Sequence, residues 1–353
     1  MADSVVGRTP LVLLPWGVHM PQHRLVVLDD WTGFYARVPA LQQLRERGEV
    51  MVYEAPATSE GEVIERLRGA TVAIANRERT QLPAGVLRAA DNLELIAQTG
   101  RIGPNVDAAA ATELGIALTA GAGAPGGHAA VAELGLALLL ALLRQIPQND
   151  ARVRCGDWAA PPTAKLHGHT LGILGLGNIG GWMARLGQAL GMQVIAWGPT
   201  LTAERAAHSQ VAYVAFDDLF RRSDVLFVSV RLSELTRGIV GAAQLALMKP
   251  TSYVINIARG PIVVEAALVE ALQERRLAGA GLDVFDQEPL PVDHPFTRLD
   301  NVVLTPHIGW GIESNFRAMV ENTIAAVVRY LDGDMSGVVN HEALERRRRR
   351  SRV

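Results

Sequence analysis

The sequence predicts an α/β protein with two doubly wound parallel sheets, because short apolar runs alternate with helix-length segments through most of the chain. In a first series, the strand-like run 24–30 is followed by a helical stretch at 38–48, and the strand-like run 49–55 by a helical stretch at 59–70. A second series begins at His169, after a glycine-rich joint at 120–127. This alternation is typical of parallel strands joined by crossover helices.

The remaining elements follow the same pattern. The first series has further strand candidates at 71–76, 93–100 and 115–120, and the second has them at 170–176, 192–197, 224–230, 252–258, 278–285 and 301–307. Helices are expected at 179–190, 242–248 and 263–276. In the stretch 311–333 apolar residues recur at helical spacing (Ile312, Phe316, Met319, Ile324, Val327, Val328 and Leu331), which predicts a helix that returns to pack on the first domain.

Charge and cysteine content narrow the classes of partner. The 353 residues include 34 basic and 36 acidic side chains, so the chain has no overall field to attract nucleic acid or a membrane, and neither is expected as a partner. The single cysteine, Cys155, has no internal disulfide partner, which favours a cytoplasmic location. No metal site is expected.

Three segments stand apart from the alternation. Residues 1–23 are expected to form a short N-terminal extension, and the arginine-rich residues 341–353 a solvated, disordered tail. The apolar stretch 128–146 has an uninterrupted core, 134–143, that is shorter than the ~20 residues of a membrane span. We therefore expect a buried helix there.

A glycine motif in the second series indicates a dinucleotide site. Gly175, Gly177 and Gly180 follow an apolar strand and open a helix. The first glycine permits a tight turn, the second lets the backbone approach a pyrophosphate, and the third allows close helix packing. The backbone N–H groups at the start of this helix would face the anion.

The position that chooses between NAD and NADP lacks its usual acidic residue. Gly198 stands where Asp or Glu would bind the ribose 2′-OH of NAD. One interpretation is a simple turn, with the ribose left to water or Thr200. The other is that a 2′-phosphate is no longer repelled and Arg205 approaches it. Both remain open, and we expect NAD(H) or NADP(H) as cofactor, with NADP(H) at least tolerated.

Three polar residues follow strands of the second series: Arg259, Glu288 and His307. The carboxyl ends of parallel strands are where ligands bind in open α/β sheets. A guanidinium matches a carboxylate, a carboxylate keeps a neighbouring imidazole protonated, and an imidazolium gives a proton to an alkoxide that forms as hydride arrives. Together they predict reduction of a 2-keto acid.

The motifs GLGNIG, NIARGPIV, GAGLDVFDQEPL and TPHIG, in this order, resemble those of the D-isomer-specific 2-hydroxyacid dehydrogenase family, in particular its glyoxylate/hydroxypyruvate reductases. The resemblance covers about residues 24–340. It implies a Rossmann NAD(P)-binding domain at 121–307, inserted in a flavodoxin-like substrate (catalytic) domain at 24–120 and 308–340. It also implies a homodimer. The helix at 129–143 is apolar all round, which favours the same conclusion.

By the resemblance, Arg259 would bind the substrate carboxylate and carbonyl, Glu288 would support His307, and His307 would be the acid/base. On the substrate side, Arg77 would face the variable end of the substrate, and the loop at Gly100 and Arg101 would offer N–H groups to its carboxylate. The residues expected around the cofactor are Gly175, Gly177, Asn178, Ile179, Gly180, Gly198, Thr200, Arg205, Ser229, Thr236, Ala258 and Asp283, the last on the nicotinamide carboxamide.

Some positions depart from the family pattern. Ser229 stands where the family often has His, and Arg231 where it often has Pro. Formate dehydrogenases share the architecture but resemble a variant with Gln in place of Glu288. Two alternatives are a non-enzymatic corepressor that senses dinucleotide redox state and a dehydrogenase for phosphite or another hydride donor. Turnover with small 2-keto acids distinguishes them.

Overall fold

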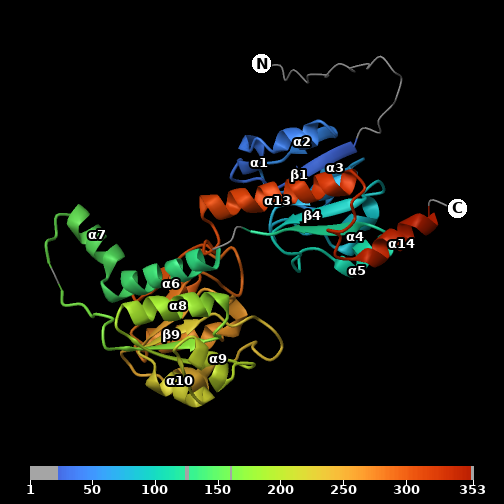
Figure 1. Cartoon of the computed structure of the whole chain (residues 1–353). Helices are drawn as coiled ribbons and strands as arrows, with labels where there is room; N and C mark the ends of the chain where they lie inside the picture. The colour runs from blue at the N-terminus through green and yellow to red at the C-terminus, as the bar shows by residue number, and fades with distance from the viewer. Residues whose placement is uncertain (1–22, 124–126, 160, 351–353) are drawn as a thin grey trace. The chain divides into compact units, whose positions relative to one another are not determined.

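The computed structural model describes residues 23–123, 127–159 and 161–350, and the chain divides into two compact units (Figure 1). Unit 1 comprises residues 1–124 and 316–353, and unit 2 comprises residues 125–315. Each contains one parallel sheet, which confirms the predicted fold class. The expected extension, apart from His23, lies outside the described residues.

Unit 1 is built on a five-stranded sheet in the order β2-β1-β3-β4-β5. Its strands are β1 (His23–Leu28), β2 (Gly48–Val52), β3 (Val72–Ala75), β4 (Leu95–Thr99) and β5 (Ala117–Gly121), which confirms the five predicted positions. The helices between them are α1 (Phe34–Arg37), α2 (Leu41–Arg45), α3 (Glu60–Leu67), α4 (Ala84–Ala89) and α5 (Ala108–Leu114). This strand order is the flavodoxin-like one.

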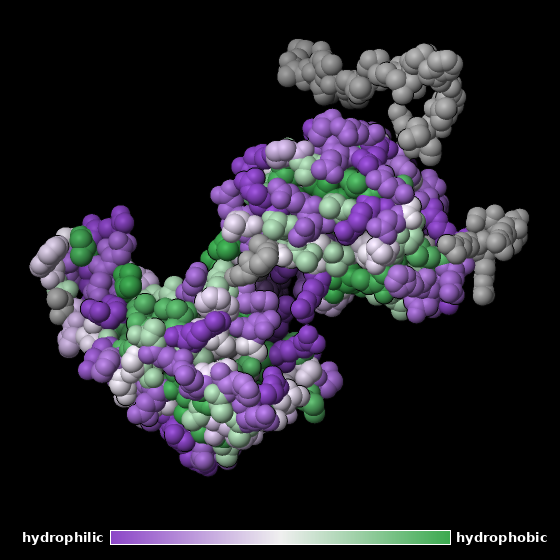
Figure 2. All heavy atoms as spheres, viewed as in Figure 1, coloured by the Kyte–Doolittle hydropathy of each residue, from purple (hydrophilic) through white to green (hydrophobic). Residues whose placement is uncertain are grey.

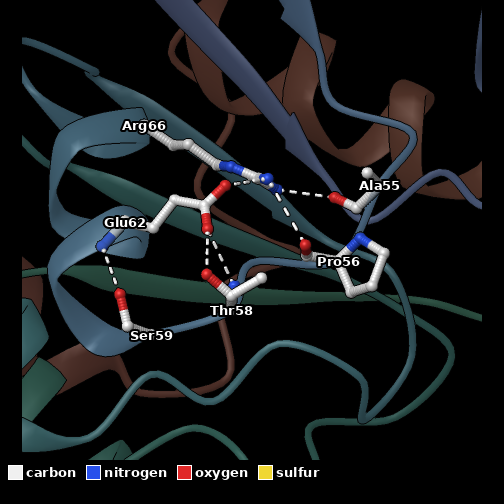
Figure 3. A network of polar contacts seen from close by, with 6 residues as sticks. All are labelled: Ala55, Pro56, Thr58, Ser59, Glu62 and Arg66. Atoms are coloured by element: carbon white, nitrogen blue, oxygen red, sulfur yellow. Dashed lines mark hydrogen bonds and ion pairs between the residues drawn. The ribbon is translucent and has the colours of Figure 1, made fainter.

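The start of α3 shows how local sequence fixes a crossover helix (Figure 3). Ser59 Oγ accepts from the Glu62 N–H at 3.2 Å, and the Glu62 carboxylate accepts from the N–H and hydroxyl of Thr58, both at 2.8 Å. The hydrogen bonds from Thr58, and to a smaller extent the one from Arg66, lower the pKa of Glu62 to about 2. Arg66 also donates to the carbonyl of Ala55 at 2.7 Å. The loop after β2 is therefore tied to α3 by the N-cap Ser59, by the bonds of Glu62 to Thr58 and by Arg66.

The chain returns to unit 1 through α13 (Glu313–Leu331), which confirms the helix predicted over 311–333. From Phe316 onward α13 belongs to unit 1, where Asn322 Nδ2 donates to the carbonyl of Ala122 at 2.7 Å. Gly121 of β5 lies so close to α13 that a Cβ there would lie 2.0 Å from Thr323 Oγ1.

The prediction of a disordered basic tail is wrong for residues 341–350, which form α14 (His341–Arg350). Before it, the Asn340 side chain accepts from the Leu118 N–H at 2.7 Å and donates to the Ile116 carbonyl at 3.0 Å. Ala343 is fully buried, and Arg347 pairs with Glu94. The run of arginines indicated a charged tail, although this segment forms a helix that packs on the rest of unit 1 with one side. Residues 351–353 lie outside the described residues.

Unit 2 has a seven-stranded sheet in the order β12-β11-β10-β9-β6-β7-β8. Six strands were predicted; the two-residue β8 was missed because it is too short for a sequence pattern. The strands are β6 (Thr170–Leu174), β7 (Gln193–Trp197), β8 (Ala212–Tyr213), β9 (Val225–Val228), β10 (Tyr253–Asn256), β11 (Gly279–Leu282) and β12 (Val302–Leu304). The helices are α6 (Gly127–Leu143), α7 (Ile146–Arg154), α8 (Asn178–Ala189), α9 (Ala203–His208), α10 (Phe216–Arg222), α11 (Ala242–Ala246) and α12 (Glu265–Gln273), with 3-10 turns η1 (Gly260–Ile262) and η2 (Pro295–Arg298).

The apolar helix α6 is buried on one side and half-buried on the other. Leu138, Leu139 and Leu142 are buried against the sheet, whereas Leu136 and Leu140 are only partly covered. A Cβ on Gly281 of β11 would lie 2.9 Å from Leu138 Cβ, so helix and sheet are in close contact. In the described ranges, length and apolar composition exclude every single helix as a membrane span, and only α6 with α7, bent by 58°, passes as a pair.

The strand order of unit 2 reverses between the parallel neighbours β6 and β9: β7 and β8 are added on the side of β6, and β10, β11 and β12 on the side of β9. In open α/β sheets, ligands bind at the carboxyl ends of the strands beside such a switch point. The glycine turn follows β6 and Ser229 follows β9, so both lie at this point.

Candidate active site

The three glycines after β6 have three different surroundings. Gly175 has a φ of +100°, and a Cβ on it would lie 2.6 Å from the backbone of Val230. A Cβ on Gly180 would lie 2.3 Å from the Gly175 carbonyl oxygen, whereas a Cβ on Gly177 would meet no atom within 4 Å. Gly177 caps α8 without a side-chain hydrogen bond, so the first N–H groups, including those of Asn178 and Ile179, face an open surface. This surface fits the pyrophosphate of a dinucleotide.

The polar residues beside this turn also serve the protein's own loops. Ser229 Oγ donates to the Gly175 carbonyl at 2.8 Å and so holds the glycine turn. Thr236 is only 2% exposed; its hydroxyl donates to the Arg231 carbonyl at 2.6 Å and accepts from the Ser233 N–H at 2.8 Å. Both hydroxyls therefore shape the edge of the expected cofactor site.

The expected ribose position lies at the end of β7. The Gly175 N–H donates to the Trp197 carbonyl at 2.8 Å, which brings the following residue, Gly198, beside the glycine turn. Arg205 Nη1 donates to the Thr200 carbonyl at 2.8 Å, and Thr202 caps α9. The exposed guanidinium of Arg205, a residue of α9, is thus bonded to the loop that carries Gly198, and position 198 itself has no carboxylate.

The Glu288 carboxylate joins His307 to the backbone. His307 Nδ1 lies 2.7 Å from Glu288 Oε2, and the Phe285 N–H donates to Glu288 Oε1 at 3.0 Å. Burial alone would raise the pKa of Glu288, but the bonds from His307 and Phe285 and the charges of His307 and Arg259 hold it below its ordinary value. Glu288 is therefore ionised at neutral pH, and His307 Nδ1 donates to it. His307 Nε2 is left free for a substrate.

Arg259 is held by a side chain that the sequence interpretation missed. Asn256, the last residue of β10, donates through Nδ2 to the Arg259 carbonyl at 3.1 Å and accepts at Oδ1 from the Ala258 N–H at 3.1 Å. The guanidinium itself is exposed and donates to the Ala258 carbonyl at 2.7 Å. An asparagine at the end of a strand, three residues before a candidate cation, was the available signal.

Asp283 fixes the loop that carries His307. Its Oδ1 accepts from the Thr305 hydroxyl at 2.6 Å and the Ile308 N–H at 2.8 Å, and its Oδ2 accepts from the Gly309 N–H at 2.9 Å. His307 lies among these donors with a φ of +54°, a left-handed conformation that a non-glycine residue rarely adopts. Asp283 is 1% exposed, so a nicotinamide carboxamide would reach it only through the second lone pair of Oδ2.

The expected substrate-side residues belong to unit 1 and follow its strands β3 and β4. Arg77 has a φ of +58°, and its carbonyl accepts from Gln98 Nε2 at 2.9 Å. Gly100 has a φ of +92°, and a Cβ there would lie 2.6 Å from Arg77 Nη1. Arg77 and Gly100 are thus brought together, and the exposed Arg101 follows them. The reacting residues and the cofactor residues all belong to unit 2.

Metal-ligating side chains do not converge in the part of the chain that the structure describes. No group of three or more His, Cys, Asp or Glu residues there is arranged to hold a metal ion. The site consists of the glycine turn, one guanidinium and one carboxylate–imidazole pair.

Known proteins resemble this chain in sequence and in fold. The family model for the D-isomer specific 2-hydroxyacid dehydrogenase, NAD binding domain, matches residues 136–309. The D-3-phosphoglycerate dehydrogenase of Archaeoglobus fulgidus is 43% identical over 239 residues, 67% of this chain and 45% of the relative. The glyoxylate reductase of Thermofilum pendens is 34% identical over 317 residues, 87% of this chain and 93% of the relative. The crystal structure of phosphoglycerate oxidoreductase from Vibrio cholerae has a TM-score of 0.81 at 30% identity and covers 88% of this chain and 99% of that one.

The two curated relatives differ in length. The chain spans about half of the phosphoglycerate dehydrogenase but nearly all of the glyoxylate reductase.

Proposed function

Because the chain belongs to the D-isomer-specific 2-hydroxyacid dehydrogenase family, we propose that it reduces a small 2-keto acid to the D-2-hydroxy acid with NAD(P)H, or catalyses the reverse reaction. The observation that carries this proposal is the 2.7 Å contact between His307 and an ionised Glu288, close enough to Arg259 for its charge to act on the carboxylate. A cation for the carboxylate of the substrate and a proton donor for its carbonyl are what this reaction needs.

The roles of the three residues follow from their chemistry. Bound at the glycine turn, the dinucleotide would supply the hydride that reaches the carbonyl carbon. The Arg259 guanidinium binds the substrate carboxylate through paired N–H donors. His307 Nε2 gives its proton to the carbonyl oxygen as negative charge develops there, and the neutral imidazole regains a proton from solvent. Glu288 stabilises the imidazolium before the transfer and keeps Nδ1 as its donor.

Substrate selection is proposed to lie with unit 1. Arg77 would face the variable end of the substrate, and the N–H groups near Gly100 and Arg101 would bind its carboxylate. The left-handed backbone at Arg77 supports this assignment, because such strain in a non-glycine residue concentrates in loops that place functional groups.

Both nicotinamide cofactors are proposed to be accepted. The family model is that of an NAD-binding domain. The finer proposal, that NADPH serves at least as well as NADH, is supported by the glycine at position 198 and by the guanidinium of Arg205, which extends from α9 to the Thr200 carbonyl of the same loop. Gly198 offers no carboxylate to accept a hydrogen bond from a ribose 2′-OH.

We also propose a homodimer and a cytoplasmic location. For the dimer, α7 buries none of its side chains, and Ile146, Val153 and Trp158 beyond α6 are 52%, 54% and 85% exposed. Figure 2 shows apolar groups at the surface over α6 and α7. A second copy that covers these groups removes them from water. The location rests on the lone, exposed Cys155.

The proposal is tested by assays with glyoxylate, hydroxypyruvate, pyruvate, phenylpyruvate and phosphite, each with both cofactors. Turnover of a 2-keto acid is expected, and His307→Ala is expected to lower kcat about 10²- to 10⁴-fold while the cofactor Kd stays unchanged. A loss in His307→Ala below about tenfold would contradict its role as proton donor. Tight binding of NADH without turnover of any compound would contradict the enzymatic function itself.

A further inference from the structure

Glu265, a second carboxylate of unit 2, contacts both ends of the segment that carries Glu288. Glu265 is the first residue of α12, and its side chain is 21% exposed. Its Oε2 accepts from the Asp286 N–H at 3.2 Å, and its Oε1 lies 3.0 Å from His294 Nε2. One carboxylate therefore attaches residues 286 and 294, and Glu288 lies between them.

His294 anchors the far end of this segment in a single tautomer. Its Nδ1 accepts from the Phe296 N–H at 3.3 Å, so the ring proton belongs to Nε2, which donates it to Glu265. Phe296 is 2% exposed and forms part of the hydrophobic core of unit 2. The far end of the segment is thus connected to the core through η2, and to α12 through the imidazole.

The near end of the segment is packed against the turn that carries Arg259. A Cβ on Gly260 would lie 2.1 Å from the carbonyl carbon of Phe285 and 2.5 Å from the Asp286 nitrogen. The Phe285 N–H donates to Glu288 Oε1, and the next N–H, that of Asp286, donates to Glu265. The turn after β10, the start of the Glu288 segment and the first turn of α12 are therefore one packed group.

We propose that Glu265, together with His294, is a positioning residue of the reaction: it holds the 286–294 segment so that Glu288 stays in contact with His307 Nδ1. This inference rests on the proposed function, because Glu265 bonds to none of Arg259, Glu288 and His307 and affects the reaction by holding the segment that carries Glu288. Without the Glu265 carboxylate, the segment loses an attachment at each end. The Glu288 carboxylate then no longer has a fixed place beside His307.

The kinetic test compares Glu265→Ala with Glu270→Ala, a matched variant that removes an exposed carboxylate from the same helix. We expect Glu265→Ala to lower kcat about 10- to 100-fold, the effect of misplacing a catalytic group by about 1 Å, with the cofactor Kd unchanged. Glu270→Ala is expected to keep the kcat of the wild type. In the Glu288→Ala background, adding Glu265→Ala is expected to lower kcat by less than about threefold more, because the side chain that it positions is already absent.

A second measurement does not depend on turnover. In the free protein, Glu265→Ala is expected to speed hydrogen exchange of the amides in 285–296, and Glu270→Ala is expected to leave them unchanged. If the wild type turns over no 2-keto acid, the proposed function fails, and the exchange rates alone decide whether Glu265 holds the segment. If Glu265→Ala does not fold, Glu265→Gln takes its place; its amide satisfies only one of the two donors and is expected to give a smaller loss in the same direction.

Two results would overturn the inference. The first is a kcat of Glu265→Ala within about threefold of the wild type together with unchanged exchange in 285–296. The second is an equal loss of kcat on adding Glu265→Ala to the wild type and to Glu288→Ala, since a residue that acts through the Glu288 side chain cannot do so after that side chain has been removed.

Discussion

Replacing Gly198 with aspartate is expected to move cofactor preference from NADPH towards NADH. A Cβ at this position would lie 3.5 Å from Leu201 Cβ and 3.6 Å from Gly175 Cα, which are ordinary van der Waals contacts. The backbone at Gly198 does not require glycine, so a Cβ is accommodated there without rearrangement. Its carboxylate would accept a hydrogen bond from a ribose 2′-OH and would repel a 2′-phosphate.

The size of this shift follows from the exposure of the loop. Two unit charges about 5 Å apart interact by roughly 3 kcal/mol at an effective dielectric constant of about 20 and by roughly 1 kcal/mol in water. Thr200 and Arg205 are exposed, so screening favours the lower part of this range even for the larger charge of a phosphate. About 1–3 kcal/mol corresponds to a change of roughly 5- to 150-fold in relative kcat/KM.

The assay is the ratio of kcat/KM for NADPH to that for NADH, at fixed keto acid and ionic strength. Gly198→Asn is the matched control, because it adds the same volume without the charge, and Arg205→Gln is expected to lower kcat/KM for NADPH alone. An equal shift in the Asn and Asp variants would refute the electrostatic reasoning. A wild-type preference for NADH above about a hundredfold would show that another group recognises the ribose.

Three further predictions follow from the site and its scaffold. Arg259→Ala is expected to raise KM for the keto acid and to lower kcat, because the charged partner is lost in both ground and transition states, and an unchanged KM would remove Arg259 as the carboxylate ligand. Burial alone would raise the pKa of Asp224, but its bonds with Lys249 and the Thr170 N–H, both at 2.7 Å, lower that pKa. The stability that the ionised Asp224 gives to the fold is therefore present at neutral pH and is lost as the pH falls through the lowered pKa. Asp224→Asn is accordingly expected to cost about 1 kcal/mol of unfolding free energy in urea at pH 7 and progressively less towards pH 3; a constant cost would count against this pair. A protein that is monomeric by light scattering at micromolar concentration would rule out the proposed dimer through α6 and α7.

The sheets could be predicted because each buried strand leaves a run of apolar residues. The positions of β1 to β5, and of all strands of unit 2 except β8, follow from that pattern. β8 has two exposed residues, Ala212 and Tyr213, and thus offers neither length nor burial to detect. α14 was missed for another reason: its arginines were read as mutually repelling, but Ala343 and Arg347 pack on unit 1 while other positions face solvent.

The candidate site was only partly visible in the sequence. Arg259, Glu288 and His307 could be selected because each follows a strand, and parallel strands end at one edge. Asn256 ends a strand and Glu265 begins a helix. Both residue types are common at such positions, so neither one indicates a role in the site. Their roles depend on which loop each side chain contacts, and sequence pattern and residue propensity do not specify that contact.

The insertion of unit 2 within unit 1 has a consequence for the order of folding. Unit 1 needs contacts between residues far apart in the chain, such as the bond from the Leu118 N–H to Asn340 Oδ1, across 222 positions. If the roughly 190 residues of unit 2 were unstructured, closing that loop would cost about 5 kcal/mol of chain entropy.

Folded, unit 2 brings its own ends together, since a Cβ on Gly127 would lie 3.0 Å from Asn315 Oδ1. Folded unit 2 then acts as a short connection between the two parts of unit 1, and α13 and α14 pack on the rest of unit 1 at little entropic cost. During synthesis, the first five strands of unit 1 emerge before unit 2 and must wait for it. Damage to the nucleotide domain is therefore expected to loosen the other domain as well, by lengthening the loop that the latter must close.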